Sequence, residues 1–283
     1  MKSSIRMPLA ALTAALVATV AGCTAAADGD KAPGRPQAAA VDKAVRRTEA
    51  VGSLRYRITG RVPGQRLGIE GATGAKPATG RIRITYLGSP DADTAVELRL
   101  VDGHLYESMS EHGVPQKTHG KHWADFGSTT DVRSYGGLKM DMSGMRDQAT
   151  QNPAREAAFL TAAENIRRTG TETVGKTRTT HYTGTVTVHD LRSRLKGLGG
   201  PGRAGRKRSL DMYAQMGVDE LTLDVWIDGQ DRVRRQRIRG FGRHGELDLT
   251  ATFRGYGKPV SVARPPAGDT VVVPAPAAPK ARG

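Results

Sequence analysis

The sequence predicts an α+β fold in which a curved antiparallel half-barrel sheet wraps over a few short helices. Apolar residues alternate with Arg and Thr in about nine or ten stretches, a pattern typical of strands with one buried face. Asp-Gly pairs, which favour hairpin turns, follow two of these stretches. The helical patterns are few and short, so the strands must curl around them to bury their apolar face.

A lipoprotein signal peptide is expected to precede this fold, at residues 1–22. Lys2 and Arg6 form a basic start, an uncharged apolar segment follows at 7–20, and small residues lead into Cys23, the only cysteine. The order Val-Ala-Gly-Cys resembles a bacterial lipobox, in which the signal is cut before the cysteine and the thiol receives diacylglycerol. We therefore predict lipidation of Cys23, which anchors the mature chain on the extracytoplasmic face of the cell membrane.

Two other interpretations of the leader remain open. The uncharged stretch 7–27 approaches the length of about 20 residues that a signal anchor needs, although it is only weakly hydrophobic. A secretory signal cut after Ala25 or Ala27 is the second, and it leaves Cys23 unexplained. With Cys23 committed to lipid, the exported domain has no disulfide and must be held together by its own core.

The first elements after the leader are a flexible tether at 23–37 and a helix at 38–51. The tether contains Gly and Pro, and the helix has Val41 and Val45 one turn apart. Beyond the helix the period changes to two, which predicts strands. The apolar faces of the first strands are expected to consist of Leu54, Tyr56, Ile58, Val62, Ile82, Ile84, Tyr86, Val96, Leu98 and Leu100.

The middle of the chain, 110–152, loses its periodicity, and we expect an irregular excursion around a short segment at 123–126. A loop of this length in a compact domain is usually functional or mobile. The methionines at 140–145 are soft enough to bind copper(I), but they also suit an adaptable apolar flap, the interpretation that we favour.

Three histidines in the same region raise the question of a metal site. His112, His119 and His122 lie close together in the sequence, but their spacing matches no compact zinc motif. Loop histidines on a solvated surface are therefore the favoured interpretation.

Helices and strands alternate again from Pro153. A helix is predicted at 153–165, with Pro in its first turn, and another at 189–196. The basic Gly/Pro stretch 197–207 is expected to be a loop that leads into a short helix ending near 216. Strands are predicted at 166–174 and 178–188, and around the apolar rows Leu221, Leu223, Val225, Ile227 and Leu247, Leu249, Ala251, Phe253.

The strand between those two rows is almost wholly basic and has an irregular pattern. Val233 and Ile238 fall on opposite parities, which predicts a β-bulge or a shift of register. Near the end, the chain becomes rich in Pro and Ala and is expected to be extended. We place the folded domain at 38–269 and a disordered tail at 270–283.

The order of several segments resembles the actinobacterial lipoproteins of the LolA-like fold, the relatives of the mycobacterial LppX and LprG group. After the lipobox and the first helix come "VDGHLYESM", "KHWADF", "PAREAAFLTAAENIRRTGTETVGKTRTTHYTGTVTV", "LDVWIDGQDRVRRQRI" and "TATFRGYGKPVSVARPPAG". The resemblance covers about 41–269 and departs from the family pattern at two insertions, 113–122 and 197–208. It implies a curved antiparallel half-barrel over helices, with a hollow in which several family members bind acylated lipids or glycolipids.

The residues themselves also favour an apolar hollow. The predicted buried face is mainly aliphatic, and the chain has only four Phe and two Trp. A cavity between such a sheet and its helices suits a hydrocarbon ligand better than an aromatic one, with a fully packed core as the alternative. The candidate cavity lining is Tyr56, Ile58, Ile84, Tyr86, Leu98, Leu100, Val186, Leu223, Val225 and Leu249.

We therefore expect a monomeric, membrane-anchored extracytoplasmic lipoprotein that binds an acylated lipid or glycolipid for envelope lipid transport. The alternative is a non-enzymatic interaction protein that uses its basic face, part of a formal net charge of +15, on cell-wall polymer or a protein partner. Nucleic acid is not expected, because the Arg residues alternate with aliphatic rather than aromatic residues. The chain has no Gly-x-Ser-x-Gly elbow and no phosphate-binding glycine loop, so we expect no enzyme, no catalytic residue, no metal and no cofactor.

Overall fold

The computed structural model describes residues 35–88, 95–108, 120–128, 132–135, 138–195 and 201–274 of the 283-residue chain. All of them belong to the unit that spans Pro33–Gly283. The predicted signal peptide, Cys23 and the predicted tether up to residue 34 lie outside the described residues, as do His112, His119 and 275–283.

Five longer helices, one short 3₁₀ turn and fourteen strands are found in the described parts of the chain. The longer helices are α1 (Arg35–Ala50), α3 (Met142–Thr150), the 3₁₀ helix η1 (Pro153–Ala162), α4 (Val188–Leu195) and α5 (Pro201–Gln215), and the short turn is η2 (Ala267–Asp269) near the end. The strands are β1 (Ser53–Val62), β2 (Gln65–Ala75), β3 (Ala78–Leu87), β4 (Ala95–Val101), β5 (His104–Ser108), β6 (Trp123–Asp125), β7 (Val132–Tyr135), β8 (Leu138–Asp141), β9 (Arg167–Val174), β10 (Thr177–Thr187), β11 (Glu220–Asp228), β12 (Val233–Gly242), β13 (Gly245–Arg254) and β14 (Thr270–Val272).

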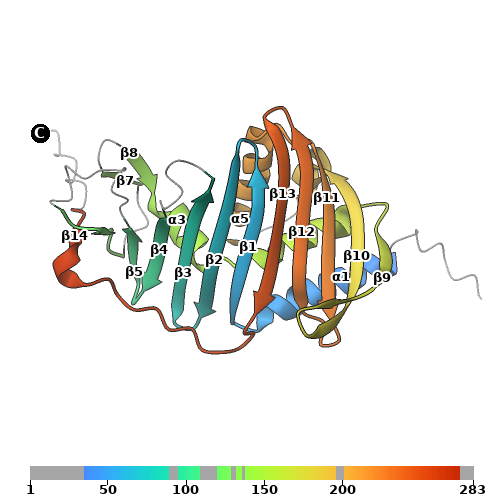
Figure 1. Cartoon of the computed structure of the whole chain (residues 1–283), viewed down its shortest axis with the longest axis horizontal. Coiled ribbons are helices and arrows are strands. Elements are labelled where there is room, and N and C mark those ends of the chain that lie inside the picture. The colour runs from blue at the N-terminus through green and yellow to red at the C-terminus, as the bar shows by residue number, and fades with distance from the viewer. Residues whose placement is uncertain are drawn as a thin grey trace, which may run out of the picture. The chain divides into compact units, whose positions relative to one another are not determined.

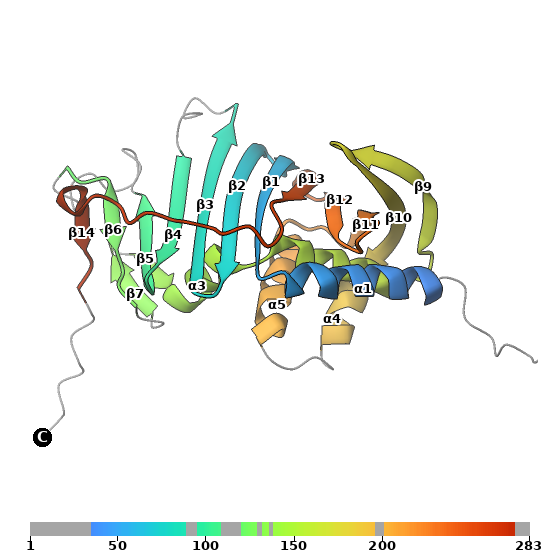
Figure 2. The same ribbon diagram turned by 90° about the horizontal axis from the view of Figure 1, so that it is seen from below.

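Twelve of the strands form one open sheet in the order β14-β6-β5-β4-β3-β2-β1-β13-β12-β11-β10-β9 (Figure 1). Neighbours are antiparallel except β14 and β6, which run parallel. Strands β7 and β8 form a separate hairpin. Figure 2 shows α1, α3, α4 and α5 on the same face of the sheet. The predicted fold class, an α+β fold with an antiparallel half-barrel sheet over a few short helices, is confirmed; the sheet is open and contains one parallel pair.

Strand β2 was not among the predicted strands, because Gly68, Gly71 and Gly74 interrupt its apolar pattern. At least one of these glycines is required by packing. Gly71 lies directly opposite Tyr56 in β1, and a Cβ atom at Gly71 would stand 2.1 Å from Cζ of the Tyr56 ring. The absent side chain lets the Tyr56 ring lie flat against the sheet on its buried face.

The predicted irregular excursion at 110–152 is only partly irregular. The short segment expected at 123–126 is present as β6, but the structure also places the β7–β8 hairpin and α3 in the described residues of this region. The prediction of a loop up to residue 152 was therefore wrong. Helix α3 packs closely on the sheet at Gly80, where a Cβ atom would stand 1.8 Å from the carbonyl oxygen of Ala149. Short elements that depend on such tertiary contacts leave little periodicity in the sequence.

Helix boundaries differ from the prediction at three places. Helix α1 begins at Arg35, three residues inside the predicted tether. The predicted helix at 153–165 is a 3₁₀ helix that ends at Ala162, and its first turn is capped by Asn152, whose side chain accepts a hydrogen bond from Ala154 N at 3.0 Å. Helix α5 already begins at Pro201, so most of the predicted basic loop is helical; Pro fits there because its fixed φ suits a first helical position.

The predicted bulge in β12 is confirmed. Ile227 pairs with Val233 while Trp226 pairs with Arg235, which leaves Arg234 as the extra residue. The extra residue reverses which alternate side chains face the helices, so that both Val233 and Ile238 are buried. Thr48 of α1 stabilises this point: its Oγ1 accepts a hydrogen bond from Val233 N at 3.0 Å and donates one to Ala44 O at 2.7 Å.

We expect the Thr48→Val variant to be less stable than the native protein by about 1–2 kcal/mol, because a buried Val233 N–H loses its acceptor. Valine has the same shape as threonine, so the change creates no cavity. Urea denaturation followed by circular dichroism measures the free energy of unfolding. An unchanged value would show that this hydrogen bond does not stabilise the bulge.

The chain after β13 runs along one end of the strands before it joins the sheet as β14 (Figure 1). Ser53 and Arg55 of β1 donate hydrogen bonds to the carbonyl oxygens of Lys258 and Pro259, both at 2.9 Å. Strand β14 then pairs with β6. The predicted domain end at residue 269 was therefore too early, since Thr270–Val272 belongs to the sheet.

The buried apolar residues form two clusters on the helical face of the sheet. The larger cluster packs α1, η1, α4 and α5 against β1 and β10–β13, with Leu160, Leu221 and Phe253 among its fully buried members. The smaller one packs α3 against β4 to β6, around Phe126 and Met142. Ile82 of β3 also belongs to the larger cluster, and Ile69 of β2 and Ile84 of β3 pack against it.

Candidate functional site

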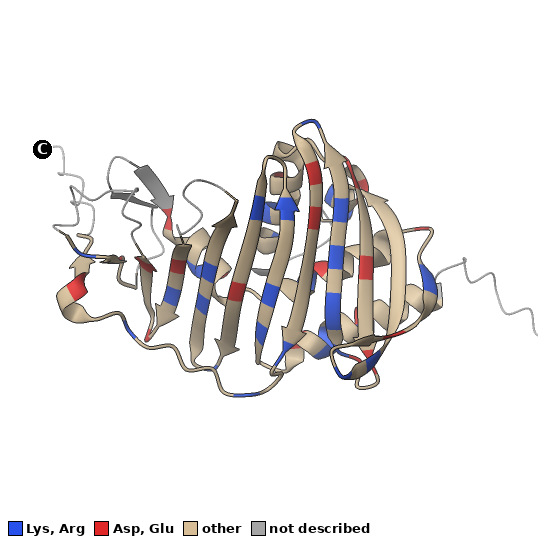
Figure 3. Cartoon of the chain, viewed as in Figure 1, with Lys and Arg blue, Asp and Glu red and all other residues tan. Residues whose placement is uncertain are grey.

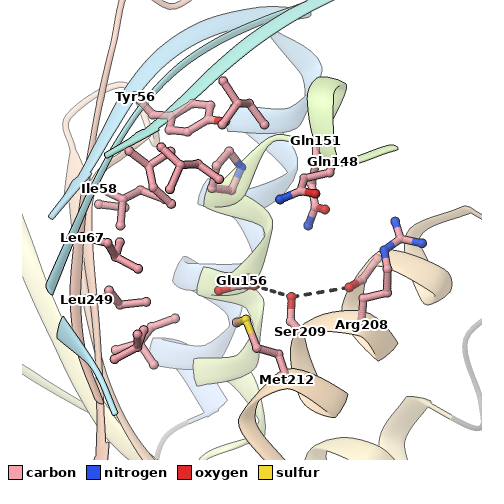
Figure 4. A pocket seen from close by; sticks show the side chains of 18 of the residues that line it. Tyr56, Ile58, Leu67, Gln148, Gln151, Glu156, Arg208, Ser209, Met212 and Leu249 are labelled. Carbon is pink, nitrogen blue, oxygen red and sulfur yellow. Dashed lines mark hydrogen bonds between the residues drawn. The ribbon is translucent and has the colours of Figure 1, made fainter. Parts of the chain in front are cut away.

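A cavity of about 500 Å³ opens between the sheet and the helices (Figure 4). Its lining comes from β1, β2, β3, β12 and β13 on the sheet side. On the other side it comes from the last residue of β8, from α3, η1 and α5, and from residues between α3 and η1. The volume lies within the range of about 300–1,000 Å³ that is typical of small-molecule sites. The alternative of a fully packed core is therefore wrong for this part of the sheet.

The sheet side of the cavity is almost wholly aliphatic. Because side chains alternate along a strand, each strand contributes every second residue to this wall. In Figure 4, Ile58, Leu67 and Leu249 face the helices across the open space. The wall consists of Tyr56, Ile58, Val62, Leu67, Ile69, Ile82, Ile84, Gln236, Ile238, Leu249 and Ala251.

The helical side of the cavity carries polar groups. Glu156 of η1 accepts hydrogen bonds from two residues of α5: Ser209 Oγ donates to its Oε1, and Tyr213 Oη donates to its Oε2 at 3.0 Å. Burial raises the pKa of Glu156, and the two hydrogen bonds offset only part of this rise. Burial and the neighbouring Glu156 also raise the pKa of Tyr213 well above its ordinary value.

Gln236 is the polar residue on the sheet wall. Its side chain is 4 % exposed, and Nε2 donates to the carbonyl oxygen of Pro153 at 3.1 Å. Its Oε1 is buried and has no hydrogen-bond partner among the described residues. Pro153 and Glu156 are three residues apart in a 3₁₀ helix and therefore lie on the same face of η1, which brings Gln236 to the polar side of the cavity.

The remaining polar residues lie nearer to solvent. Arg208 of α5 pairs with Asp147 of α3 at 3.0 Å, and both side chains are largely exposed. Gln148 and Gln151 point into the open space from the α3 side, and Met212, with 38 % of its surface exposed, does so from α5 (Figure 4). The cavity thus has one apolar wall, one polar wall and a solvent-accessible side.

The predicted lining residues divide into two groups. Tyr56, Ile58, Ile84 and Leu249 line the cavity. The others do not: Val186, Leu223 and Val225 belong to the larger core, Leu100 belongs to the smaller core, Leu98 is buried opposite Ile82, and Tyr86 is half-buried beyond the lining. All of them face the predicted side of the sheet, but η1, α1 and α4 cover β10 and β11 without leaving space.

The residues that sequence reasoning missed are the polar ones, Glu156, Ser209, Tyr213 and Gln236. Gln236 could have been noticed, since it shares a parity with Ile238 on the buried side of its strand. Ser209 and Tyr213 follow the stretch that was expected to be a loop. The predicted methionine flap is also different in the structure: Met142 is fully buried in the smaller core, and Met145 lines the cavity from within α3.

The other face of the sheet is charged, as Figure 3 shows, and several of its carboxylates are paired with arginines. Glu97 accepts hydrogen bonds from Arg81 at 2.8 Å and Arg99 at 2.7 Å, and Asp224 accepts from Arg239 at 2.6 Å. Burial acts to raise the pKa of Glu97 and Asp224, but the arginines and, for Asp224, His181 hold both pKa values below their ordinary range. Much of the basic charge is therefore neutralised within this face.

We expect stability to fall as the pH is lowered below about 4, because the pKa values of Glu97 and Asp224 are lower in the folded than in the unfolded chain. Their contribution is complete above the unfolded pKa and is lost as they take up protons. Glu156 has the opposite effect on the pH dependence of stability, because its pKa is raised in the folded chain. Melting temperatures between pH 7 and pH 3 check this, and Asp224→Asn should flatten the acid part of the curve. A melting temperature that rises below pH 4 would contradict the expectation.

Histidine side chains make contacts near both ends of the sheet. Trp226 is stacked on His181 with 4.2 Å between ring centroids, and its Nε1 donates to Glu172 at 2.9 Å. Near the other end of the sheet, His122 bonds to Asp269 through Nδ1 at 2.7 Å. Within the described ranges, no group of three or more His, Cys, Asp and Glu residues is arranged to hold a metal ion. None of the described helices has both the length and the apolar character of a membrane span.

Fold and site together define a class: an open antiparallel sheet with helices on one face and an internal, largely aliphatic cavity of ligand size. No family model matches the sequence. A candidate lipoprotein of Streptomyces coelicolor, SCO4650, is 30% identical over 246 residues, which cover 83% of this chain and 74% of that protein. An uncharacterised 31.2 kDa protein in the rplA–rplJ intergenic region of Streptomyces griseus is 31% identical over 211 residues, 71% of this chain and 67% of that protein.

The chain belongs to the family of these two Streptomyces proteins, which confirms the predicted relationship to actinobacterial lipoproteins. Among solved structures, lipoprotein LppX of Mycobacterium tuberculosis is 17% identical, with a TM-score of 0.49 over 81% of this chain and 100% of that chain. LprF from Mycobacterium bovis is 11% identical, with a TM-score of 0.47 over 81% of this chain and 97% of that chain.

Proposed function

We propose that this protein is an extracytoplasmic lipoprotein, anchored through Cys23, that holds the acyl part of a lipid or glycolipid in its cavity and transfers it within the cell envelope without covalent chemistry. The aliphatic sheet wall of the cavity is the observation that carries the proposal. It offers Ile, Leu and Val side chains on five strands to whatever enters.

The chemistry of this wall favours hydrocarbon chains. An aliphatic surface offers no partner to a polar ligand, and transfer of apolar surface out of water is favourable. Each buried methylene contributes about 0.8 kcal/mol. Ten methylenes would thus contribute about 8 kcal/mol before the costs of association, an amount equivalent to a micromolar Kd.

The predicted anchor supports a lipid ligand, because it keeps the cavity close to a membrane. The family relationship to a candidate lipoprotein agrees with the lipobox at Cys23. Two acyl chains on one residue give stable membrane binding, whereas a single chain gives only reversible binding.

Replacing Cys23 with Ala should release the protein from the membrane fraction, because the variant has no thiol to lipidate. Fractionation of cells that express either form, followed by immunoblotting, measures the distribution. A Cys23→Ser variant should behave in the same way, since serine keeps the size of the side chain but not the thiol. Retention of both variants at the membrane would favour a signal anchor instead.

Transfer between membranes is the direct test of the proposed activity. Donor vesicles that carry a fluorescent acyl lipid and acceptor vesicles without it are mixed with the purified mature protein. We expect transfer to accelerate in proportion to protein concentration. A transfer rate equal to that of vesicles alone, with several acyl lipids tried, would contradict the proposal.

A further inference from the structure

The buried polar groups of the cavity, on Glu156, Ser209, Tyr213 and Gln236, leave mainly hydrogen-bond acceptors free. The two carboxyl oxygens of Glu156 accept one hydrogen bond each, from Ser209 and Tyr213. A carboxylate offers about four acceptor positions, so further positions remain. Gln236 adds a buried amide oxygen that has no partner among the described residues, while its amide nitrogen is occupied by Pro153 O. A ligand group that donates hydrogen bonds would complement this wall.

Cations are scarce at the same place. Among the described residues that line the cavity, Arg208 is the only Lys or Arg, and its guanidinium is paired with Asp147 at 3.0 Å near the solvent. Glu156 and Asp141 are carboxylates on the lining. A phosphate or free carboxylate group brought to the polar wall would therefore meet like charge without a compensating cation.

We propose that the cavity selects acyl lipids whose polar group is uncharged and donates hydrogen bonds, such as the hydroxyl groups of a glyceride or a sugar, and that Glu156 and Gln236 recognise those hydroxyls. This inference rests on the proposed function, since it concerns the polar part of the same ligand. Acyl chains contact the aliphatic sheet wall, and the hydroxyls face η1 and α5. Free fatty acids and acyl phosphates are discriminated against.

The burial of Glu156 agrees with this selectivity. Burial disfavours its charged form and therefore raises its pKa, although the hydrogen bonds from Ser209 and Tyr213 offset part of this rise. A second anionic group in the same cavity would be disfavoured for the same reason. A hydroxyl donor, in contrast, satisfies acceptors that are otherwise left without a partner in a buried site.

The test compares three ligands that share one acyl chain: monopalmitoylglycerol, palmitic acid and palmitoyl lysophosphatidic acid. Each is titrated at pH 8 into the delipidated mature protein, and displacement of the neutral dye Nile red reports binding. We expect monopalmitoylglycerol to bind at least about tenfold more tightly than either anionic lipid, a difference of about 1.4 kcal/mol. Equal affinities, or tighter binding of an anionic lipid, would overturn the inference and leave the proposed function intact. Binding of none of the three would instead contradict the proposed function.

Variants assign the selectivity to residues. Glu156→Gln removes the charge but keeps an acceptor, so palmitic acid should bind more tightly and the preference should fall below about threefold. Glu164→Gln is the matched control, because it makes the same chemical change at an exposed position outside the cavity lining and should leave the preference unchanged. Gln236→Met removes the free acceptor and should weaken the binding of monopalmitoylglycerol, but not that of the two anionic lipids. A melting curve establishes whether the Glu156→Gln variant is folded. If it is folded and its ligand preference is unchanged, the role of Glu156 is refuted. If it does not fold, the three-ligand comparison on the native protein decides the inference.

Discussion

Replacing Ile58 with Trp is expected to weaken acyl-lipid binding strongly while the protein stays folded. Ile58 lies in the middle of β1 and faces the cavity, where it is only partly buried because the space in front of it is open. An indole at this position would fill the volume that an acyl chain needs, without displacing side chains of the fully buried core. We expect binding of an acyl lipid to weaken at least about tenfold, a loss of about 1.4 kcal/mol or more.

The neighbouring residue supplies the control. Thr59 follows Ile58 in β1 but points to the exposed face of the sheet. Thr59→Trp adds the same large side chain to the same strand, outside the cavity, and should bind lipid as the native protein does. Titration with Nile red and melting curves measure both variants. Equal lipid binding by the two tryptophan variants would show that the cavity is not where the acyl chain binds.

Replacing Gly80 with Ala should cause the largest loss of stability among the substitutions considered. The added Cβ would stand 1.8 Å from Ala149 O and 2.7 Å from Ala149 C, both of them backbone atoms of α3. Backbone cannot rotate out of the way as a side chain can, so α3 must move off the sheet. We expect a loss at the top of the range of about 1–3 kcal/mol that overpacking usually causes.

The same change should also weaken lipid binding, because α3 carries Met145 and Gln148 on the cavity lining. Gly68→Ala is the control: Gly68 lies on the neighbouring strand β2, and a Cβ atom added there would have no other atom within 4 Å. Urea denaturation should give a clearly lower free energy of unfolding for Gly80→Ala than for Gly68→Ala. A Gly80→Ala protein as stable as Gly68→Ala would mean that α3 is not held against β3 as described.

The sequence predicts the sheet well where side chains alternate strictly. The alternation in β1, from Leu54 through Tyr56 to Ile58, survives in the structure, and even the bulge in β12 was predictable because Val233 and Ile238 could not share a face on a regular strand. Strand β2 was not predictable in the same way. Its glycines are explained by a contact with Tyr56, and that contact depends on how two strands pair.

The position of the cavity could not be predicted from the periodicity of the sequence. Ile58 and Leu223 have the same inward parity, yet Ile58 faces open space whereas Leu223 is packed in the larger core. The difference lies in which helix covers each strand, and periodicity carries no information about that. The polar wall was missed for a related reason: Glu156 and Ser209 become neighbours only because η1 and α5 pack side by side, although 53 residues separate them in the chain.

The central claim is that the cavity holds an acyl chain, and native mass spectrometry of the purified mature protein tests it most directly. We predict a bound species whose extra mass, after solvent extraction, belongs to an acyl lipid, and its disappearance from Ile58→Trp but not from Thr59→Trp. A native protein that carries no lipid, and that takes up none after incubation with acyl lipid vesicles, would contradict the account.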